Sequence, residues 1–116
     1  MNDHKAISNI FAMCREDERC KQKFGESLQN EFEAFVDRLE KKPLSISVTH
    51  PWTFEPLAIV VTPDVLLTAL WNLTYDERDV VDLPIIISSI LAGSKDRLTN
   101  LIRIHMVNEL TVKSLN

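Results

Sequence analysis

Hydrophobic residues recur with the spacing of α-helices along most of this chain. The clearest example is residues 26–42, where apolar side chains follow the i, i+4, i+7 pattern of one helix face. These side chains are Leu28, Phe32, Phe35, Val36 and Leu39. Pro43 is predicted to end this helix, because proline lacks the amide hydrogen that would continue it. Shorter helices are predicted over residues 6–13 and 18–23.

A period of two replaces the helical period after Pro43. Leu44, Ile46 and Val48 alternate with polar residues, which predicts a half-buried strand. The apolar run at residues 57–61 predicts a second strand that pairs with the first as a hairpin. Because an isolated hairpin is only marginally stable, we expect helices to cover one of its faces.

Two helices are predicted to follow the hairpin, one after the other. Thr62 can cap a helix whose first position is Pro63, and the apolar residues that follow predict that it runs to about Leu73. Residues 74–77, Thr-Tyr-Asp-Glu, have the capping-box form that begins a helix. We therefore expect a helix of several turns followed by a short one.

Two more helices are predicted near the end of the chain. Pro84 suits the first position of a helix over residues 85–92, and Gly93 suits the position after its last turn. Ser94 can cap the final helix. The apolar face of that helix consists of Leu98, Leu101, Ile102, Met106 and Leu110. Together these elements predict one mainly α domain, residues 1–116, with about five to six helices and one inserted β-hairpin.

Two cysteines, Cys14 and Cys20, lie six residues apart. In one continuous helix their side chains would point roughly 120° apart with a rise of about 9 Å. A disulfide requires Cα atoms within about 7 Å. The pair is therefore either unbonded, or the helix breaks between the cysteines and a disulfide joins two short helices. Asp17 favours the break, because its side chain can cap a second helix that begins at Glu18.

Composition and charge limit the classes of partner. A chain of 116 residues with 45% hydrophobic content is large enough for one domain with its own core. The net charge of −4 does not favour binding to nucleic acid or to an anionic lipid surface, so neither is expected as a partner. The longest apolar runs, residues 57–61 and 85–90, are far too short to span a membrane. The first residues lack the apolar stretch of a signal peptide.

No pattern in the sequence predicts catalysis or a bound metal. The Gly-x-Ser-x-Gly elbow, the glycine-rich phosphate loop and the His-x-x-x-His pair are all absent. His4, His50 and His105 lie far apart in sequence, and two cysteines alone are too few for a zinc site. We therefore expect no catalytic residue, no metal and no cofactor in this chain. His105 is expected to be a core or interface residue.

Two groups of side chains are candidates for contact with a substrate or partner. Trp52 and Phe54 lie in the predicted hairpin loop, where exposed aromatics can anchor a partner. The alternative is that they fold back onto the hairpin or a helix. The second group is an acidic run made of Asp76, Glu77, Asp79 and Asp82. Its charge can attract the amino terminus of a substrate, and the alternative is that it complements a helix dipole.

These elements follow one another in a distinctive order. The series begins with the Cys14 and Cys20 pair and continues with the helix that ends at Pro43, the alternating strands and the helix after Thr62. It ends with Leu-Pro-Ile-Ile-Ile at residues 83–87, Ala-Gly-Ser-Lys after it and a leucine-bearing helix. This order, over about residues 7–104, resembles the lid (cap) domain of secreted α/β-hydrolases of the tripeptidyl aminopeptidase and proline iminopeptidase type.

The resemblance implies a non-catalytic domain that works together with a hydrolase core. In that family the lid interrupts a serine-hydrolase core, covers its active site and helps to select peptides by their amino ends. The resemblance also implies that Cys14 and Cys20 form a disulfide and that the protein is periplasmic or extracellular. The expected partners are the hydrolase core and a peptide substrate, which Trp52, Phe54 and the acidic run would face.

A freestanding helical module for protein interaction or dimerisation is the alternative interpretation. A lid without its core would expose the apolar surface that faces the cleft, so a homodimer is expected under either interpretation. The chain begins with methionine and carries no catalytic core, which suits an excised fragment or a lid that stands alone. A thiol switch is a third interpretation, disfavoured because Glu16, Asp17 and Glu18 oppose the cations near the cysteines.

Overall fold

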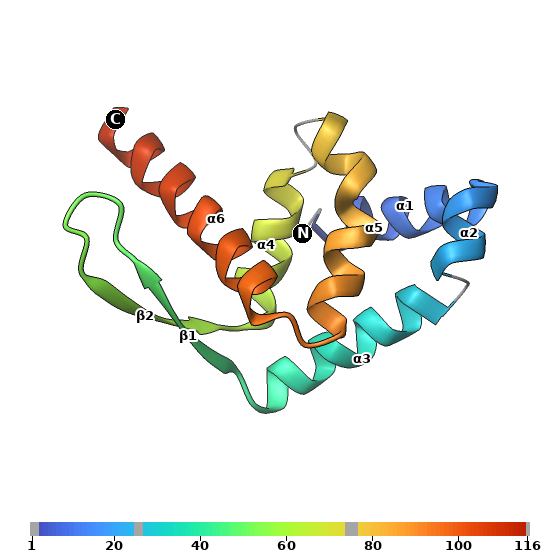
Figure 1. Ribbon diagram of the computed structural model, residues 1–116, viewed down its shortest axis with the longest axis horizontal. Helices are drawn as coiled ribbons and strands as arrows, with labels where there is room; N and C mark the ends of the chain where they lie inside the picture. The colour runs from blue at the N-terminus through green and yellow to red at the C-terminus, as the bar shows by residue number, and fades with distance from the viewer. Residues whose placement is uncertain (1–2, 25–26, 74–76, 116) are drawn as a thin grey trace.

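Six α-helices and one antiparallel hairpin form the part of the chain that the computed structural model describes, residues 3–24, 27–73 and 77–115 (Figure 1). Side chains are described for residues 7–24, 27–73 and 82–107. In chain order the elements are α1 (Asp3–Glu16), α2 (Glu18–Phe24), α3 (Ser27–Lys41), β1 (Leu44–Thr49), β2 (Pro56–Val61), α4 (Pro63–Leu73), α5 (Glu77–Leu91) and α6 (Lys95–Leu115). The predicted fold class is therefore confirmed.

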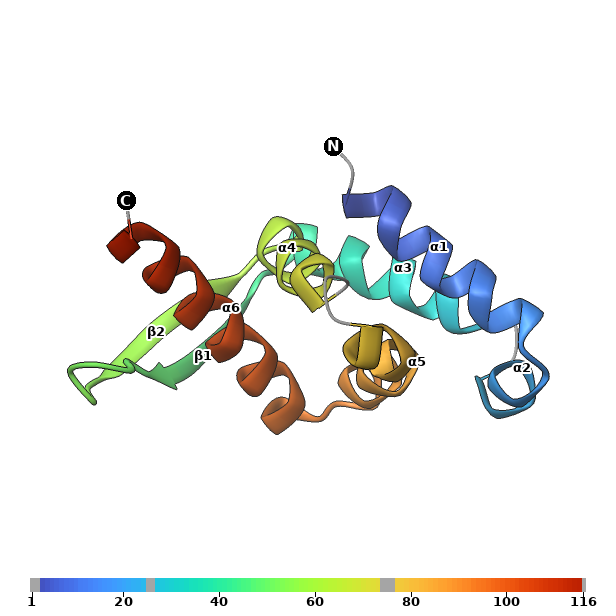
Figure 2. The same ribbon diagram turned by 90° about the horizontal axis from the view of Figure 1, so that it is seen from above.

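The core is built around α4, which packs against α1, α3, α5, α6 and β2 (Figure 2). Thr62 caps this helix as predicted, since its Oγ1 accepts the Val65 N–H at 3.3 Å. Pro63 takes the first helical position. Leu66 and Leu70 are completely buried. Neighbours on several sides explain why α4 carries mostly apolar residues, because little of its surface is left for water.

α3 confirms the clearest pattern in the sequence. Of its predicted apolar face, three side chains are buried, Leu28, Phe32 and Leu39, and two are half-buried against the core, Phe35 and Val36. The rings of Phe32 and Phe11 form a tilted pair with centroids 5.5 Å apart, which joins α3 to α1. The helix ends at Lys41, just before Pro43.

α1 and α2 meet at a corner that a disulfide between Cys14 and Cys20 closes. α1 ends at Glu16 and α2 begins at Glu18, so the helix breaks where the sequence predicts. Asp17 caps α2, because its Oδ1 accepts the Cys20 N–H at 2.9 Å. The break brings the two cysteine Cα atoms to 5.1 Å, within reach of a disulfide. The bond that the resemblance implies is present, and α1 extends beyond the predicted residues 6–13 at both ends.

The two strands pair in antiparallel register, with Leu44 opposite Val61 and Thr49 opposite Pro56. Val48 and Val61 are buried, whereas Leu44 is 41% exposed. α6 packs on β1, and α4 follows directly from β2 (Figure 1). The predicted half-buried hairpin is therefore confirmed, and the helices supply the cover on one face that it needs.

The prediction that a new helix begins at Pro84, after a separate short helix, is wrong. α5 is one helix from Glu77 to Leu91 with Pro84 inside it. Pro84 cannot donate a hydrogen bond to the carbonyl one turn earlier, which normally breaks or kinks a helix. Here Leu83 and Ile87 on either side of it are almost completely buried, and this packing outweighs the missing bond. Most of the predicted capping box, residues 74–76, lies outside the described residues.

The turn between α5 and α6 is a Schellman motif at Gly93. The Gly93 N–H donates to the Ile90 carbonyl at 3.0 Å, and the Ser94 N–H donates to the Ser89 carbonyl at 3.1 Å. Gly93 has a φ of 95°, which glycine adopts without a steric penalty. Ser94 then caps α6, because its Oγ accepts the Arg97 N–H at 3.3 Å. Both predicted helix boundaries are confirmed.

Replacing Gly93 by alanine is expected to lower the free energy of unfolding by about 1 kcal/mol. Nothing lies within 4 Å of the Cβ that alanine would add, so the cost comes from backbone strain rather than from a clash. Gly93→Asn should cost less, because asparagine tolerates the left-handed conformation better. Urea unfolding followed by circular dichroism measures both variants, and equal losses would contradict a backbone origin.

α6 is the last element and covers the hairpin side of the core. Leu98, Leu101 and Ile102 are buried, and Met106 is half-buried, as the predicted apolar face requires. The side chain of Leu110 lies outside those described. Among the described helices, none combines the length and the apolar character that crossing a membrane requires.

Candidate functional site

One side chain, His50, organises the loop at the tip of the hairpin. Its Nδ1 accepts the backbone N–H of Trp52 at 3.1 Å and that of Thr53 at 3.2 Å. Its backbone N–H donates to the Glu55 carbonyl at 2.9 Å, and its carbonyl accepts the Phe54 N–H at 3.0 Å. Because Nδ1 faces two donors, it must carry a lone pair, so the ring is the tautomer with its proton on Nε2. Hydrogen bonds between residues of the loop itself therefore hold its conformation.

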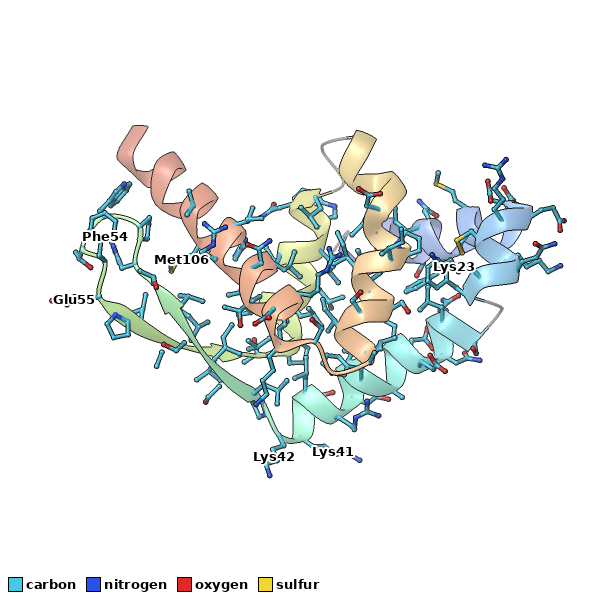
Figure 3. The ribbon with its side chains drawn as sticks, viewed as in Figure 1. Lys23, Lys41, Lys42, Phe54, Glu55 and Met106 are labelled. Carbon is cyan, nitrogen blue, oxygen red and sulfur yellow. A yellow bond between two sulfur atoms is a disulfide. The ribbon has the colours of Figure 1, made fainter. Side chains whose placement is uncertain are left out.

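The ordered loop presents two aromatic side chains to solvent. Trp52 is 58% exposed and Phe54 is 78% exposed, and Figure 3 shows Phe54 at the far end of the hairpin. The alternative that both fold back onto the hairpin or a helix is wrong. Phe54 also has a φ of 61°, a conformation that costs a non-glycine residue roughly 1–2 kcal/mol. Strain of this kind gathers at functional sites, which makes the loop the stronger of the two candidate groups.

Replacing His50 by alanine is expected to speed hydrogen exchange at the Trp52 and Thr53 amides about five- to tenfold, because both lose their acceptor and a hydrogen bond contributes about 1 kcal/mol. His50→Asn is the matched control, since the asparagine oxygen can accept the same two N–H groups in an Asx turn. Amide exchange followed by NMR measures the effect. Equal exchange in His50→Ala and the unsubstituted protein would show that the side chain does not order the loop.

The part of the acidic run that the structure describes, Asp82, is not brought to the aromatic loop. Asp82 is exposed on α5, and Glu77 and Asp79 belong to the first turn of the same helix. Asp76 lies outside the described residues, as do the side chains of Glu77 and Asp79. Figures 1 and 2 both show α6 and α4 between the hairpin and α5. Asp82 therefore lies on a different part of the surface from Trp52 and Phe54, and the sequence positions of Glu77 and Asp79 in the first turn of α5 suit the helix dipole.

His105 has a structural partner rather than a catalytic one. The Asn72 side-chain Nδ2 donates to His105 Nδ1 at 2.8 Å, which ties α4 to α6 in a half-buried position. This contact agrees with the predicted core or interface role. Within the described part of the chain, no three histidine, cysteine, aspartate or glutamate side chains come together as metal ligands would.

A hollow of about 400 Å³ lies beside the disulfide corner, between α1, α2 and α5. Its walls are mainly apolar, and Asp17, Arg19 and Lys23 are its charged members. The full lining is Ile10, Met13, Cys14, Asp17, Arg19, Cys20, Lys23, Phe24, Pro84 and Ile85. Sequence reasoning missed this site because its lining comes from three separate helices. One feature of the sequence could have indicated the site. Arg19 and Lys23 are four residues apart, and this spacing places both on one face of α2.

Comparison with known proteins gives no relative from which to transfer a function. No family model, no curated protein and no solved structure matches this chain. Its function is therefore inferred from the order of its elements and from the geometry of the hairpin loop and the hollow.

Proposed function

We propose that this chain is the lid domain of a serine α/β-hydrolase that acts on the amino ends of peptides. The support is the order of its elements: a disulfide-closed corner, the amphipathic α3, the hairpin, α4, and two helices joined through Gly93 and Ser94. The observation that carries most weight is the Cys14–Cys20 bond at the head of this series. A structural disulfide suits a protein exported to an oxidising periplasmic or extracellular compartment.

A lid of this kind acts by position rather than by chemistry. It closes over the cleft, excludes water and restricts which substrates reach the nucleophile. The exposed Trp52 and Phe54 would contact the peptide. The serine, histidine and aspartate of the reaction would come from the core domain, so this chain alone should hydrolyse nothing.

The length of the natural reading frame tests the proposal directly. A frame that continues upstream through Gly-x-Ser-x-Gly and downstream to an aspartate and a histidine would support it. A stop codon after Asn116 together with a true start at Met1 would contradict it. Peptidase activity of the isolated chain would contradict it as well, because the proposal assigns every reacting group to the core.

Replacing Trp52 and Phe54 together by alanine in the full-length hydrolase is expected to raise KM for peptide substrates about fivefold, with a smaller change in kcat, because truncation removes apolar contact with the bound peptide. Replacing Ser45 and Ser47 by alanine is the matched control, since both lie exposed on the same hairpin. Steady-state kinetics with unblocked peptides measures both variants. An equal change in the two would mean that the aromatics do not face the substrate.

A freestanding dimerisation module is the second candidate, and one observation favours it. Neither strand of the hairpin carries a charged residue, and Val60 on its outer face is 55% exposed. Uncharged edge strands are prone to pair with another chain. Light scattering on the natural protein separates the candidates: the mass of a stable dimer of a 116-residue product supports the module, and the mass of a longer monomer supports the lid.

A further inference from the structure

We propose that the hollow beside the disulfide corner binds a small apolar molecule that ends in a carboxylate, of the chemical class of medium-chain fatty acids. The site is separate from the hairpin loop, and the proposal does not depend on the lid function. Three features support it: the way α2 is held in place, the apolar interior of the hollow and the charge at its rim.

α2 is held at this place by a covalent bond and a cap rather than by burial. None of its residues is fully buried, and its aromatic side chain, Phe24, is half-buried and lines the hollow. The Cys14–Cys20 disulfide and the Asp17 cap fix the helix beside α1 and α5. A helix that adds little to the core and is nevertheless fixed forms a preformed wall, which spares a ligand the cost of ordering it.

The interior of the hollow suits a hydrocarbon chain. Ile10 and Met13 of α1, Phe24 of α2, and Pro84 and Ile85 of α5 line it. Met13 is 57% exposed and Ile85 is 40% exposed, so apolar surface remains open to water at this corner. A ligand that covered these side chains would remove that surface from water. The volume of about 400 Å³ lies within the usual range for small-molecule sites.

The charge at the rim selects an anion. Arg19 and Lys23 both line the hollow and are exposed, and among the described residues neither is paired with a carboxylate. The Lys23 ammonium lies 5.8 Å from the centre of the Phe24 ring, at the edge of the apolar wall, and Figure 3 shows Lys23 on the side of α2 that faces α5. The Asp17 carboxylate, the other charged group of the lining, already accepts the Cys20 N–H. A ligand with an apolar chain inside the hollow and one carboxylate beside Arg19 and Lys23 therefore complements the site.

The test uses the chain with ¹³C-labelled methionine methyl groups, titrated with decanoate below its micelle concentration and followed by NMR. The Met13 methyl signal is expected to shift and saturate, whereas the Met106 signal, from α6 on the hairpin side, stays in place (Figure 3). Decanol and decyltrimethylammonium, which carry the same chain without the negative charge, should bind at least fivefold more weakly. No saturable shift at Met13, or equal affinity for the three probes, would overturn the proposal.

Two variants locate the site. Arg19→Gln combined with Lys23→Gln should weaken decanoate at least fivefold and remove its advantage over decanol. Lys41→Gln combined with Lys42→Gln is the matched control for charge, and these lysines border a separate hollow at the end of α3, far from α2 (Figure 3). Unchanged affinity in the first variant, or an equal loss in the control, would overturn the assignment. Ile85→Asp, which places a carboxylate at an exposed position of the lining, should abolish binding.

Discussion

Replacing Leu70 by alanine is expected to lower the free energy of unfolding by about 3 kcal/mol, the largest effect of any single truncation proposed for this chain. Leu70 is completely buried in α4, the helix that contacts α1, α3, α5 and α6. Truncation removes apolar contact within the core and leaves a cavity that the surrounding helices can close only in part. Urea unfolding followed by circular dichroism measures the change.

The matched control is the same substitution at an exposed leucine. Leu44 begins β1 and is 41% exposed, so Leu44→Ala should cost less than about 1 kcal/mol. The side chain removed is the same in both variants, and its burial is the main difference between the two positions. Equal losses would show that α4 is not the centre of the core.

Replacing Cys14 and Cys20 by alanine is expected to lower the free energy of unfolding by about 2 kcal/mol. The disulfide closes a short loop, and cross-linking a short loop removes less entropy from the unfolded chain than cross-linking a long one. Local order should change more than global stability, because no residue of α2 is fully buried and the bond holds the helix at its corner. Hydrogen exchange should therefore rise most in α2.

Reduction of the unsubstituted protein provides the control for this variant. A reducing agent should lower its free energy of unfolding by a similar amount and should leave the double alanine variant unchanged. If the double variant retains both its stability and the slow amide exchange of α2, packing rather than the disulfide holds the corner. Decanoate binding is expected to weaken together with the order of α2, since Phe24 and Lys23 line the hollow.

Features whose causes lie within a few residues could be predicted from the sequence. The break at Asp17 follows from the cap and from the cysteine spacing, and the end of α5 follows from Gly93. The caps of α4 and α6 depend on one hydroxyl each, at Thr62 and Ser94. In each case the decisive hydrogen bond spans no more than five residues, so tertiary packing does not have to be known.

Features whose causes lie in packing could not be predicted in the same way. Pro84 carries the same local signal whether it begins a helix or lies inside one. The burial of Leu83 and Ile87 against the core decides between the two, and that burial depends on distant helices. The exposure of Trp52 and Phe54 depends on how His50 hydrogen-bonds the loop, and the hollow depends on how three helices meet. Candidate sites were therefore harder to predict than helices.

The Cys14–Cys20 bond can form before most of the domain has been synthesised. Its cysteines are six positions apart, so ring closure needs only α1, Asp17 and the first turn of α2, and no later element. These 116 residues contain two cysteines, so oxidation within them has a single product. Such a domain requires an oxidant but no isomerase to correct mispaired bridges. Among these residues, pairing between two chains is the one oxidative error that remains.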